Sequence, residues 1–158
     1  MARLEGCTVG LDGVVAQQEN YRKSGFVLDC RNIRHTGVPQ GINAPDQHGF
    51  EIRPVEPGDI PVLADFDRGR FGAARDGFLP RWLLPTGPNS RQALMISDKG
   101  ALAGFGAIRP CRKSYKIGPL FVNGLEPARA LFSSLCALVP PGSEITLDTP
   151  EDNMQAVQ

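Results

Sequence analysis

Two spacings of apolar residues divide most of this chain into short strands and helices. Short β-prone stretches rich in apolar residues predict strands over 50–53, 93–97, 101–108 and 115–122, and a tight turn at 98–100 joins the middle two into a hairpin. Helical spacing predicts a helix from residue 60, with Asp59 as its N-cap. A second helix is predicted over 78–84, where Phe78 and Trp82 are expected to be buried and Leu79 is a further candidate.

The C-terminal part of the chain continues with one helix and one strand. Ala128, Leu131, Leu135 and Leu138 recur at helical spacing and form a single apolar stripe. Pro140-Pro141-Gly142 ends this helix, and residues 144–147 predict a last strand. Helices separated by a hairpin favour an α/β protein with a mixed sheet and helices on the faces of the sheet.

The first 36 residues carry a separate strand–helix–strand pattern. We predict a strand over 8–15, a helix over 16–23 that stops at Ser24-Gly25, and a second strand from Phe26. Residues 39–49 gather Gly, Pro, Asn and Asp with few large apolar side chains, which is typical of a linker. The predicted parts are therefore a piece over 1–38, a linker over 39–49 and a domain over 50–158.

Charge and cysteine usage narrow the class of protein. The 17 Lys and Arg residues balance the 17 Asp and Glu residues, so nucleic acid and anionic membranes are not favoured partners. No apolar run approaches the roughly 20 residues that span a bilayer, and the N-terminus lacks the apolar core of a signal peptide. Cys7, Cys30, Cys111 and Cys136 show no C-x-x-C spacing, which favours a cytoplasmic location with reduced thiols, Cys136 being a core residue.

Metal binding is not expected from the spacing of the possible ligands. His35 and His48 are isolated from cysteines and carboxylates at ligand spacing. Asp65 and Asp67 lie too close along the predicted helix to share a face, and we expect both to be solvated.

Four stretches carry a resemblance to a known family. The segments VVAQQENYRKSGF, CRNIRH, GFGAIRPCRKSYKIGPLF and LDTPEDNMQAVQ resemble two-domain, YitH-type members of the GNAT superfamily of N-acetyltransferases. Residues 1–36 resemble the end of the first GNAT domain, and residues 50–158 resemble the C-terminal GNAT domain. The resemblance implies a GNAT-like fold that is incomplete at both ends. The first domain would lack its cofactor-binding half, and the second domain would lack its last helix and strands.

The resemblance also implies a chemistry. GNAT enzymes transfer the acetyl group of acetyl-CoA directly to an amine, without a covalent enzyme intermediate. The tyrosine at the place of Tyr21 can protonate the departing thiolate, which makes Tyr21 the catalytic candidate. Alternatively, the ring of Tyr21 packs against the strand predicted before its helix.

The place of the family's phosphate-binding loop, R/Q-x-x-G-x-G/A, is occupied by VNGLEPAR over residues 122–129. Val122, Asn123 and Gly124 are therefore the candidates for binding acetyl-CoA through backbone N–H groups and the helix dipole. The loop departs from the family pattern because it has a single glycine, a negative charge at Glu126 and no N–H at Pro127. These departures favour a structural helix cap, and Pro119 predicts a bulge in the preceding strand.

Basic residues between two predicted strands are the strongest local charge imbalance. Arg109 and Lys116 are candidates for binding an anionic substrate or the 3′-phosphate of the CoA adenosine, and Tyr115 either lines the cleft or packs under it. The alternative is that Arg109, Arg112, Lys113 and Lys116 mark a solvated turn.

Two functions from different classes remain open. The first is an acetyl-CoA-dependent N-acetyltransferase that acts on a small-molecule or other amine of unidentified structure. The second is a non-catalytic GNAT-like binding or dimerisation module that has lost acetyl-CoA binding. Residues 8–34 are predicted to cover the sheet edge left by the missing closing element, within one chain or in a homodimer.

Overall fold

The computed structural model describes residues 6–40, 49–87 and 90–157, which fall into two compact units, Met1–Arg31 and Asn32–Gln158. The first unit contains a 3₁₀ helix, η2 (Val15–Gln17), that continues into α1 (Gln18–Lys23), which confirms the predicted helix. The strands predicted over 8–15 and from Phe26 are wrong, because residues 7–14 and 26–31 have no regular structure. Gly10 and Gly13 weaken a strand, and the described residues of this unit offer no second strand to pair with.

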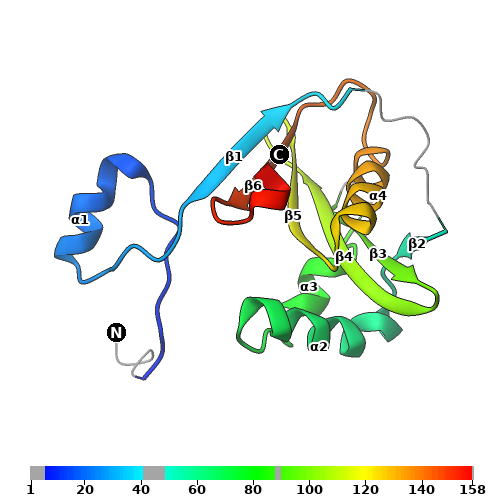
Figure 1. Cartoon of the computed structure of the whole chain (residues 1–158), viewed down its shortest axis with the longest axis horizontal. Coiled ribbons are helices and arrows are strands. Elements are labelled where there is room, and N and C mark those ends of the chain that lie inside the picture. Colours follow the sequence, from blue (N-terminus) through cyan, green and yellow to red (C-terminus); the bar gives the residue numbers. More distant parts are fainter. Residues whose placement is uncertain (1–5, 41–48, 88–89, 158) are drawn as a thin grey trace. The chain divides into compact units, whose positions relative to one another are not determined.

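The second unit is built on one six-stranded sheet with the order β1-β6-β5-β4-β3-β2 (Figure 1). Its strands are β1 (Asn32–Gly37), β2 (Glu51–Pro54), β3 (Gln92–Asp98), β4 (Ala101–Pro110), β5 (Tyr115–Val122) and β6 (Ile145–Pro150). All neighbouring strands are antiparallel except β5 and β6, which are parallel. The mixed sheet predicted from the apolar pattern is confirmed.

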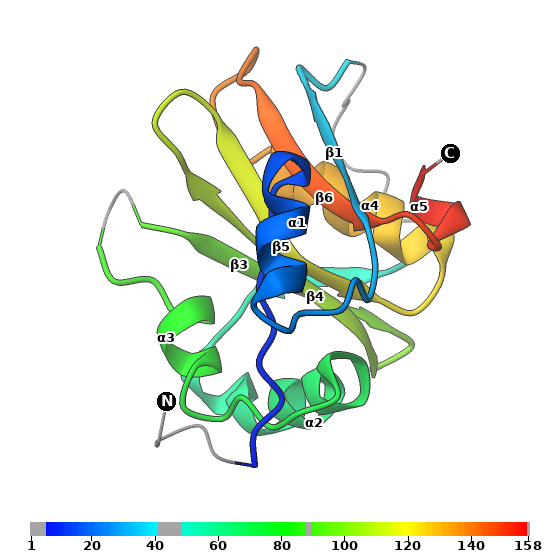
Figure 2. The same cartoon turned by 90° about the vertical axis from the view of Figure 1, so that its left-hand side faces the viewer.

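Helices cover both faces of the sheet. The second unit contains η3 (Pro57–Asp59), α2 (Ile60–Phe71), α3 (Leu79–Leu83), α4 (Leu125–Cys136) and the short α5 (Met154–Val157). Alternate residues of β3 point to opposite faces. Leu94 and Ile96 pack with α4, whereas Ala93 and Met95 pack with α2 and α3. In Figure 2, α4 lies behind the strands, apart from α2 and α3. We call these two sides the α4 face and the α2/α3 face.

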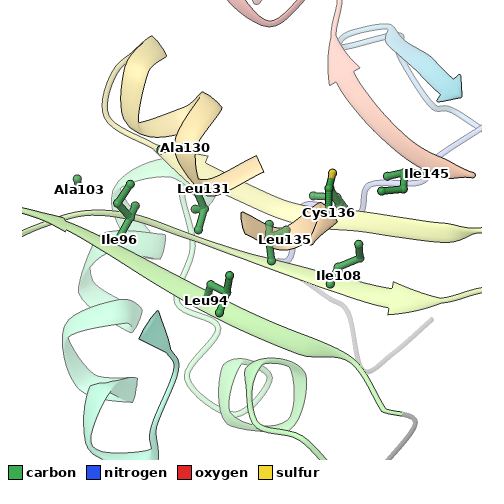
Figure 3. Packing of buried hydrophobic residues seen from close by; sticks show 10 residues of the cluster. Leu94, Ile96, Ala103, Ile108, Ala130, Leu131, Leu135, Cys136 and Ile145 are labelled. Atoms are coloured by element: carbon green, nitrogen blue, oxygen red, sulfur yellow. The ribbon is translucent and has the colours of Figure 1, made fainter. Parts of the chain in front are cut away.

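The core on the α4 face contains the apolar stripe that the sequence predicts. Leu131 and Leu135 are completely buried between α4 and the strands (Figure 3). Leu138 packs against the same cluster from beyond the end of the helix. Cys136 is buried in this cluster, as predicted.

The burial of Cys136 gives the first testable prediction. Burial raises the pKa of the Cys136 thiol to about 11, whereas Cys7, Cys30 and Cys111 are exposed. Because the thiolate is the reactive form, we expect three thiols of the native protein to react with a disulfide reagent at pH 8 and the fourth only after unfolding. A Cys136→Ala variant provides the control, since it should lose only the slow thiol. Four equally fast thiols in the native protein would contradict this placement.

The region of α2 and α3 differs from the sequence prediction at two residues. Phe78 is 42% exposed and stacks on Trp82 with ring centroids 5.2 Å apart, so its predicted burial is wrong. Leu79 and Leu83 fill the buried positions of α3 instead, since residues four apart share a helix face. Asp67 is completely buried on α2 and is not solvated as predicted, because Arg75 donates two hydrogen bonds to its carboxylate.

The N-terminus of α2 also differs in detail from the prediction. Asp59 occupies the N-cap position of α2, but its side chain makes no capping hydrogen bond to that helix. Its carboxylate instead accepts hydrogen bonds from the Glu56 N–H (2.8 Å) and from the guanidinium of Arg53 (2.7 Å). These hydrogen bonds close the preceding turn and fix the direction in which α2 leaves β2.

The strand β1 occupies the sheet edge beside β6. It pairs with β6 in antiparallel register from Asn32↔Pro150 to Gly37↔Ile145, within one chain. Residues 8–34 are predicted to cover this edge, and of these only the residues from Asn32 onward pair with it.

The predicted division of the chain is only partly described. The boundary between the two compact units falls after Arg31, and the assignment of residues 1–38 to a separate domain stays a prediction. Of the predicted linker, residues 41–48 lie outside the described part of the chain.

Candidate functional site

The parallel strands β5 and β6 are paired only at their starts. Tyr115–Ile117 lie in register with Ile145–Leu147. In the described structure, the rest of β5 pairs with β4 alone. Beyond this point β6 offers no partner to the backbone of β5. Trp82 donates to the Gly118 carbonyl oxygen, and the other backbone polar groups that face away from β4 are left to water or to a ligand. An extended ligand fits this requirement because it can accept and donate hydrogen bonds along the backbone of a strand.

A bulge in β5 begins where the two strands part. Ile117 opposes Ile108 and Leu120 opposes Gly106, so β5 carries one residue more than β4 at Gly118-Pro119. This is the bulge that Pro119 predicts. Because of the extra residue, both Ile117 and Leu120 contribute to the α4 face.

A glycine of β4 allows the C-terminal end of β5 to approach closely. A Cβ atom on Gly104 would lie 2.5 Å from the carbonyl oxygen of Phe121 and 2.8 Å from Cα of Val122. These are backbone positions, so a side chain on Gly104 would displace the end of β5. The absence of a side chain at Gly104 thereby determines the position of the loop that joins β5 to α4.

The loop after β5 holds the three residues predicted to bind acetyl-CoA. The N–H of Asn123 donates to the carbonyl oxygen of Ala103 (2.8 Å), and its side-chain oxygen accepts a hydrogen bond from Arg70. Gly124 is the N-cap of α4 with φ +102°, a backbone conformation that favours glycine. The first helical hydrogen bond runs from the Ala128 N–H to the Gly124 carbonyl oxygen (3.2 Å), so the N–H groups before Ala128 have no partner within the helix.

The chemistry of this helix start is mixed. Backbone N–H groups and the helix dipole favour an anion, but Pro127 supplies no donor. The negative charge of Glu126 is offset by Arg129, whose guanidinium lies 3.3 Å from the Glu126 carboxylate on the exposed surface. Fewer donors are therefore available than in the family's glycine-rich loop. Those that remain fit a phosphate group through the backbone of Gly124 and Leu125.

The structure brings two of the predicted substrate-binding residues together. Arg109 and Lys116 oppose each other in the β4–β5 register, so their side chains leave the same face of the sheet. The Nζ of Lys116 donates to Asp148 (2.5 Å), and Asp148 also accepts two hydrogen bonds from Arg34 (2.7 and 2.9 Å). The predicted pair is thus part of a larger charged cluster in which Lys116 has a carboxylate partner.

Asp148 and Arg34 are site residues that the sequence reasoning missed. The hydrogen bonds from Arg34, together with the ammonium group of Lys116, hold the pKa of the Asp148 carboxyl well below its usual range. Asp148 therefore stays ionised throughout the neutral range and is a weak proton acceptor. The two residues are 114 positions apart in the chain, and no local motif connects them.

Tyr115 and Trp82 lie at opposite sides of the bulged strand. Tyr115 packs against the core on the α4 face, away from the face that carries Arg109 and Lys116. Trp82 on α3 donates its Nε1–H to the carbonyl oxygen of Gly118 (3.1 Å), which ties α3 to the bulge. From the sequence Trp82 is expected only to be buried, and its hydrogen bond to Gly118 could not be predicted.

Tyr21, the predicted catalytic residue, belongs to the first compact unit. It lies on α1, and its ring packs so closely on Gly13 that a Cβ atom there would be 2.5 Å from the ring. Its carbonyl oxygen accepts hydrogen bonds from the N–H groups of Ser24 and Phe26, both at 3.0 Å. These contacts agree with the packing alternative for the ring, and the catalytic role of Tyr21 stays a prediction.

Comparison with protein families decides what this arrangement is. A family model described as the acetyltransferase (GNAT) domain matches residues 63–158, which include the bulged strand, the start of α4 and β6. The chain belongs to the GNAT acetyltransferase family. GNAT acetyltransferases generally use an acyl-CoA as the acyl donor, and membership of this family supports acyl transfer in general.

A relative at 31% identity and several solved structures agree with this assignment. The chain is 31% identical over 144 residues to the holothin acyltransferase of Pseudoalteromonas sp. (strain SANK 73390), over 90% of this chain and 47% of that protein. The chain thus spans about half the length of this relative.

The solved structures bear on the fold of this GNAT chain alone, because their sequence identities are low. A putative acetyltransferase from Pyrococcus horikoshii superposes with a TM-score of 0.66 at 21% identity, over 93% of this chain and 45% of its own. A GCN5-related N-acetyltransferase from Kribbella flavida gives 0.63 at 12% identity, over 85% and 34%. The predicted GNAT-like fold is confirmed, whereas the two-domain arrangement stays a prediction.

The described residues provide neither a membrane-spanning helix nor a cluster of metal ligands. No described helix combines the length and the apolar character needed to cross a membrane. The same residues contain no group of three or more His, Cys, Asp or Glu side chains that could hold a metal ion. The candidate site of this GNAT domain is built from backbone groups, an aromatic side chain and charged side chains.

Proposed function

We propose that this GNAT domain takes part in an acetyl-CoA-dependent N-acetyltransferase that passes the acetyl group directly to an amine. The observation that carries the proposal is the parting of β5 from β6 after Ile117 and Leu147, next to the start of α4. That parting leaves strand backbone available to an extended ligand, and the helix start favours an anion at the end of it. An acyl-CoA has both features, an extended arm and a diphosphate.

The residues fit this donor mainly through their backbone. Val122 ends the part of β5 that pairs with β4 but not with β6. Gly124 and Leu125 present N–H groups at the start of α4. Asn123 fixes the loop by its hydrogen bonds to Ala103 and Arg70 and is in our proposal a positioning residue. Acetyl-CoA would supply a thioester whose acetyl carbon forms the new bond to the amine nitrogen while the carbon–sulfur bond breaks.

The acceptor would approach from the α2/α3 face. Arg109 and Lys116 project from that face beside the bulge, and we assign them to acceptor binding. Tyr115 supports the same strand from the opposite face. Within the first compact unit, Tyr21 stays the candidate proton donor to a departing thiolate, a role that requires a cofactor sulfur within hydrogen-bond distance of its hydroxyl. Asp148 is excluded from the proposal as a general base because its low pKa leaves it a weak proton acceptor.

The second candidate function is a GNAT-like binding or dimerisation module that does not bind acetyl-CoA. The observations that favour it are the occupied N–H and side chain of Asn123 and the absence of an N–H at Pro127. Both reduce the number of donors available to a diphosphate. The two functions differ in one measurable quantity, the affinity for acetyl-CoA.

A pair of glycine variants tests the proposed donor site. Gly124 and Gly142 both have positive φ values, +102° and +80°, so alanine is strained at either position and should cost about 1–2 kcal/mol of stability. Only Gly124 lies at the proposed phosphate site. We therefore expect Gly124→Ala to weaken acetyl-CoA binding about tenfold or more, measured by calorimetry, whereas Gly142→Ala keeps the affinity of the unmodified chain. Equal affinities in both variants would remove the helix start from the donor site.

A further inference from the structure

Three half-buried cations form a row across the α2/α3 face of the sheet. Arg109 and Lys116 are opposite each other on β4 and β5. Gln92 opposes Ile108, so Arg91 and Arg109 are the next residues beyond this pair on their two chain segments. Like charges at neighbouring positions on adjacent strands are unfavourable. Repulsion within this row of cations therefore lowers the stability of the fold unless a negative charge lies beside them.

The protein supplies that negative charge to only one end of the row. Lys116 forms an ion pair with Asp148. Arg91 and Arg109, in contrast, form no ion pair with a carboxylate of the described residues: Arg91 donates to the carbonyl oxygen of Arg81 (2.8 Å), and Arg109 donates to the sulfur of Cys111 (3.2 Å). Each guanidinium carries five N–H donors in a planar fork, which leaves several donors for an external acceptor.

Trp82 holds the two unpaired guanidinium groups at one place. The guanidinium carbon of Arg91 lies 4.9 Å from the centre of the Trp82 rings, and that of Arg109 lies 5.9 Å from it. Stacking on an aromatic ring restricts an arginine side chain and so reduces the entropy that it loses on binding a ligand. Because Trp82 Nε1 also donates to Gly118 at the bulge, both arginines are anchored beside the point where β5 leaves β6.

We propose that Arg91 and Arg109 bind the carboxylate of the acceptor, which is therefore an amine that also carries a carboxylate, such as an amino acid. The inference rests on the proposed N-acetyltransferase function, since it assigns the acceptor of that reaction. Planar guanidinium groups match a carboxylate in geometry and bind it through two parallel hydrogen bonds. Because Trp82 contacts the bulge at Gly118, a carboxylate bound by these two arginines places the acceptor next to the bulge of β5.

Matched pairs of ligands test the inference by direct binding. The full chain is titrated in a calorimeter with L-leucine against 3-methylbutylamine and with L-phenylalanine against 2-phenylethylamine, because the members of each pair differ only in the carboxylate. We expect the amino acid of at least one pair to bind about tenfold more tightly than its amine. Arg91→Gln and Arg109→Gln should each abolish this preference. Arg112→Gln, in the exposed turn, is the matched control and should retain it.

Two further measurements separate binding from folding and from donor recognition. The three variants should melt within about 2 °C of the unmodified chain, because no carboxylate partner is lost in any of them. The affinities for CoA and dephospho-CoA should also stay unchanged in Arg91→Gln and Arg109→Gln. A selective loss of CoA affinity would assign the two arginines to the adenosine 3′-phosphate and would overturn the inference.

Each remaining outcome points to one of the two proposals. No preference in either pair, or a preference that survives both arginine substitutions, overturns the carboxylate site. If acetyl-CoA binds but the preference is absent, the acceptor assignment fails alone. If the preference is present but acetyl-CoA does not bind, the carboxylate site stands and the proposed acetyltransferase function fails.

Discussion

An Arg75→Met variant is expected to lose about 3–5 kcal/mol of folding free energy, because the substitution leaves an uncompensated charge in the protein interior. The carboxylate of Asp67 is completely buried on α2, and Arg75 donates both of its recorded hydrogen bonds. Methionine keeps much of the arginine's apolar stem but offers no donor. Unfolding in urea, followed by circular dichroism, measures the loss.

Two comparisons isolate the buried charge as the cause. Arg68→Met removes an arginine from an exposed pair with Asp65 on the same helix, and an exposed pair contributes about 0–1 kcal/mol. The double variant Asp67→Leu/Arg75→Met should recover most of the stability, since it removes the charge together with its partner. If Arg75→Met costs no more than Arg68→Met, Asp67 is not buried as the structure shows.

A Phe105→Ala variant is expected to lose about 3–5 kcal/mol of folding free energy. The Phe105 ring is completely buried on β4 and makes edge-to-face contacts with Phe66 on α2 (6.1 Å) and Phe121 on β5 (5.8 Å). Its removal would leave a cavity at the point where three elements meet. Because Phe121 lies on β5 just before the loop that leads into α4, we also expect acetyl-CoA binding to weaken in this variant.

The matched control for this cavity is an exposed phenylalanine. Phe71 is 53% exposed at the end of α2, and Phe71→Ala should cost less than about 1 kcal/mol. Denaturant unfolding of both variants gives the difference. Comparable losses for Phe105 and Phe71 would mean that Phe105 is not at the centre of the core on the α2/α3 face.

The elements with strong apolar periodicity could be predicted from the sequence. The strand at 115–122 has the predicted bounds, and the stripe through Leu131 and Leu135 correctly identifies the buried face of α4. The N-terminal strand over 8–15 failed, because a strand needs a partner as well as apolar residues and the first unit offers none among its described residues. Local pattern is informative where the sheet supplies that partner.

Burial around α2 and α3 could not be predicted, because it depends on tertiary packing. Phe78 has the composition of a core residue, yet it lies at the start of a very short helix whose buried positions are Leu79 and Leu83. Asp67 has the composition of a surface residue, and its burial depends on Arg75, which follows in a loop after the helix. Neither outcome follows from helical spacing alone.

The candidate site was predicted in part for the same reason. The loop 122–124 is local in sequence, and Arg109 and Lys116 are neighbours because the strands that carry them are consecutive and antiparallel. Asp148, Arg34 and Arg91 come to the same face through strands that are distant in the chain. The order of the strands in the sheet is what assembles these residues, and a single sequence does not specify that order.

The thermal stability of this chain with and without acetyl-CoA tests the central claim most directly. A ligand that binds the native state at 100 times its dissociation constant adds about 2.7 kcal/mol, which corresponds to a rise in Tm of about 5–10 °C. We predict such a rise for the unmodified chain and for Gly142→Ala, and a smaller one for Gly124→Ala. An unchanged Tm of the unmodified chain at saturating acetyl-CoA would contradict donor binding at the start of α4 and would favour the non-catalytic module.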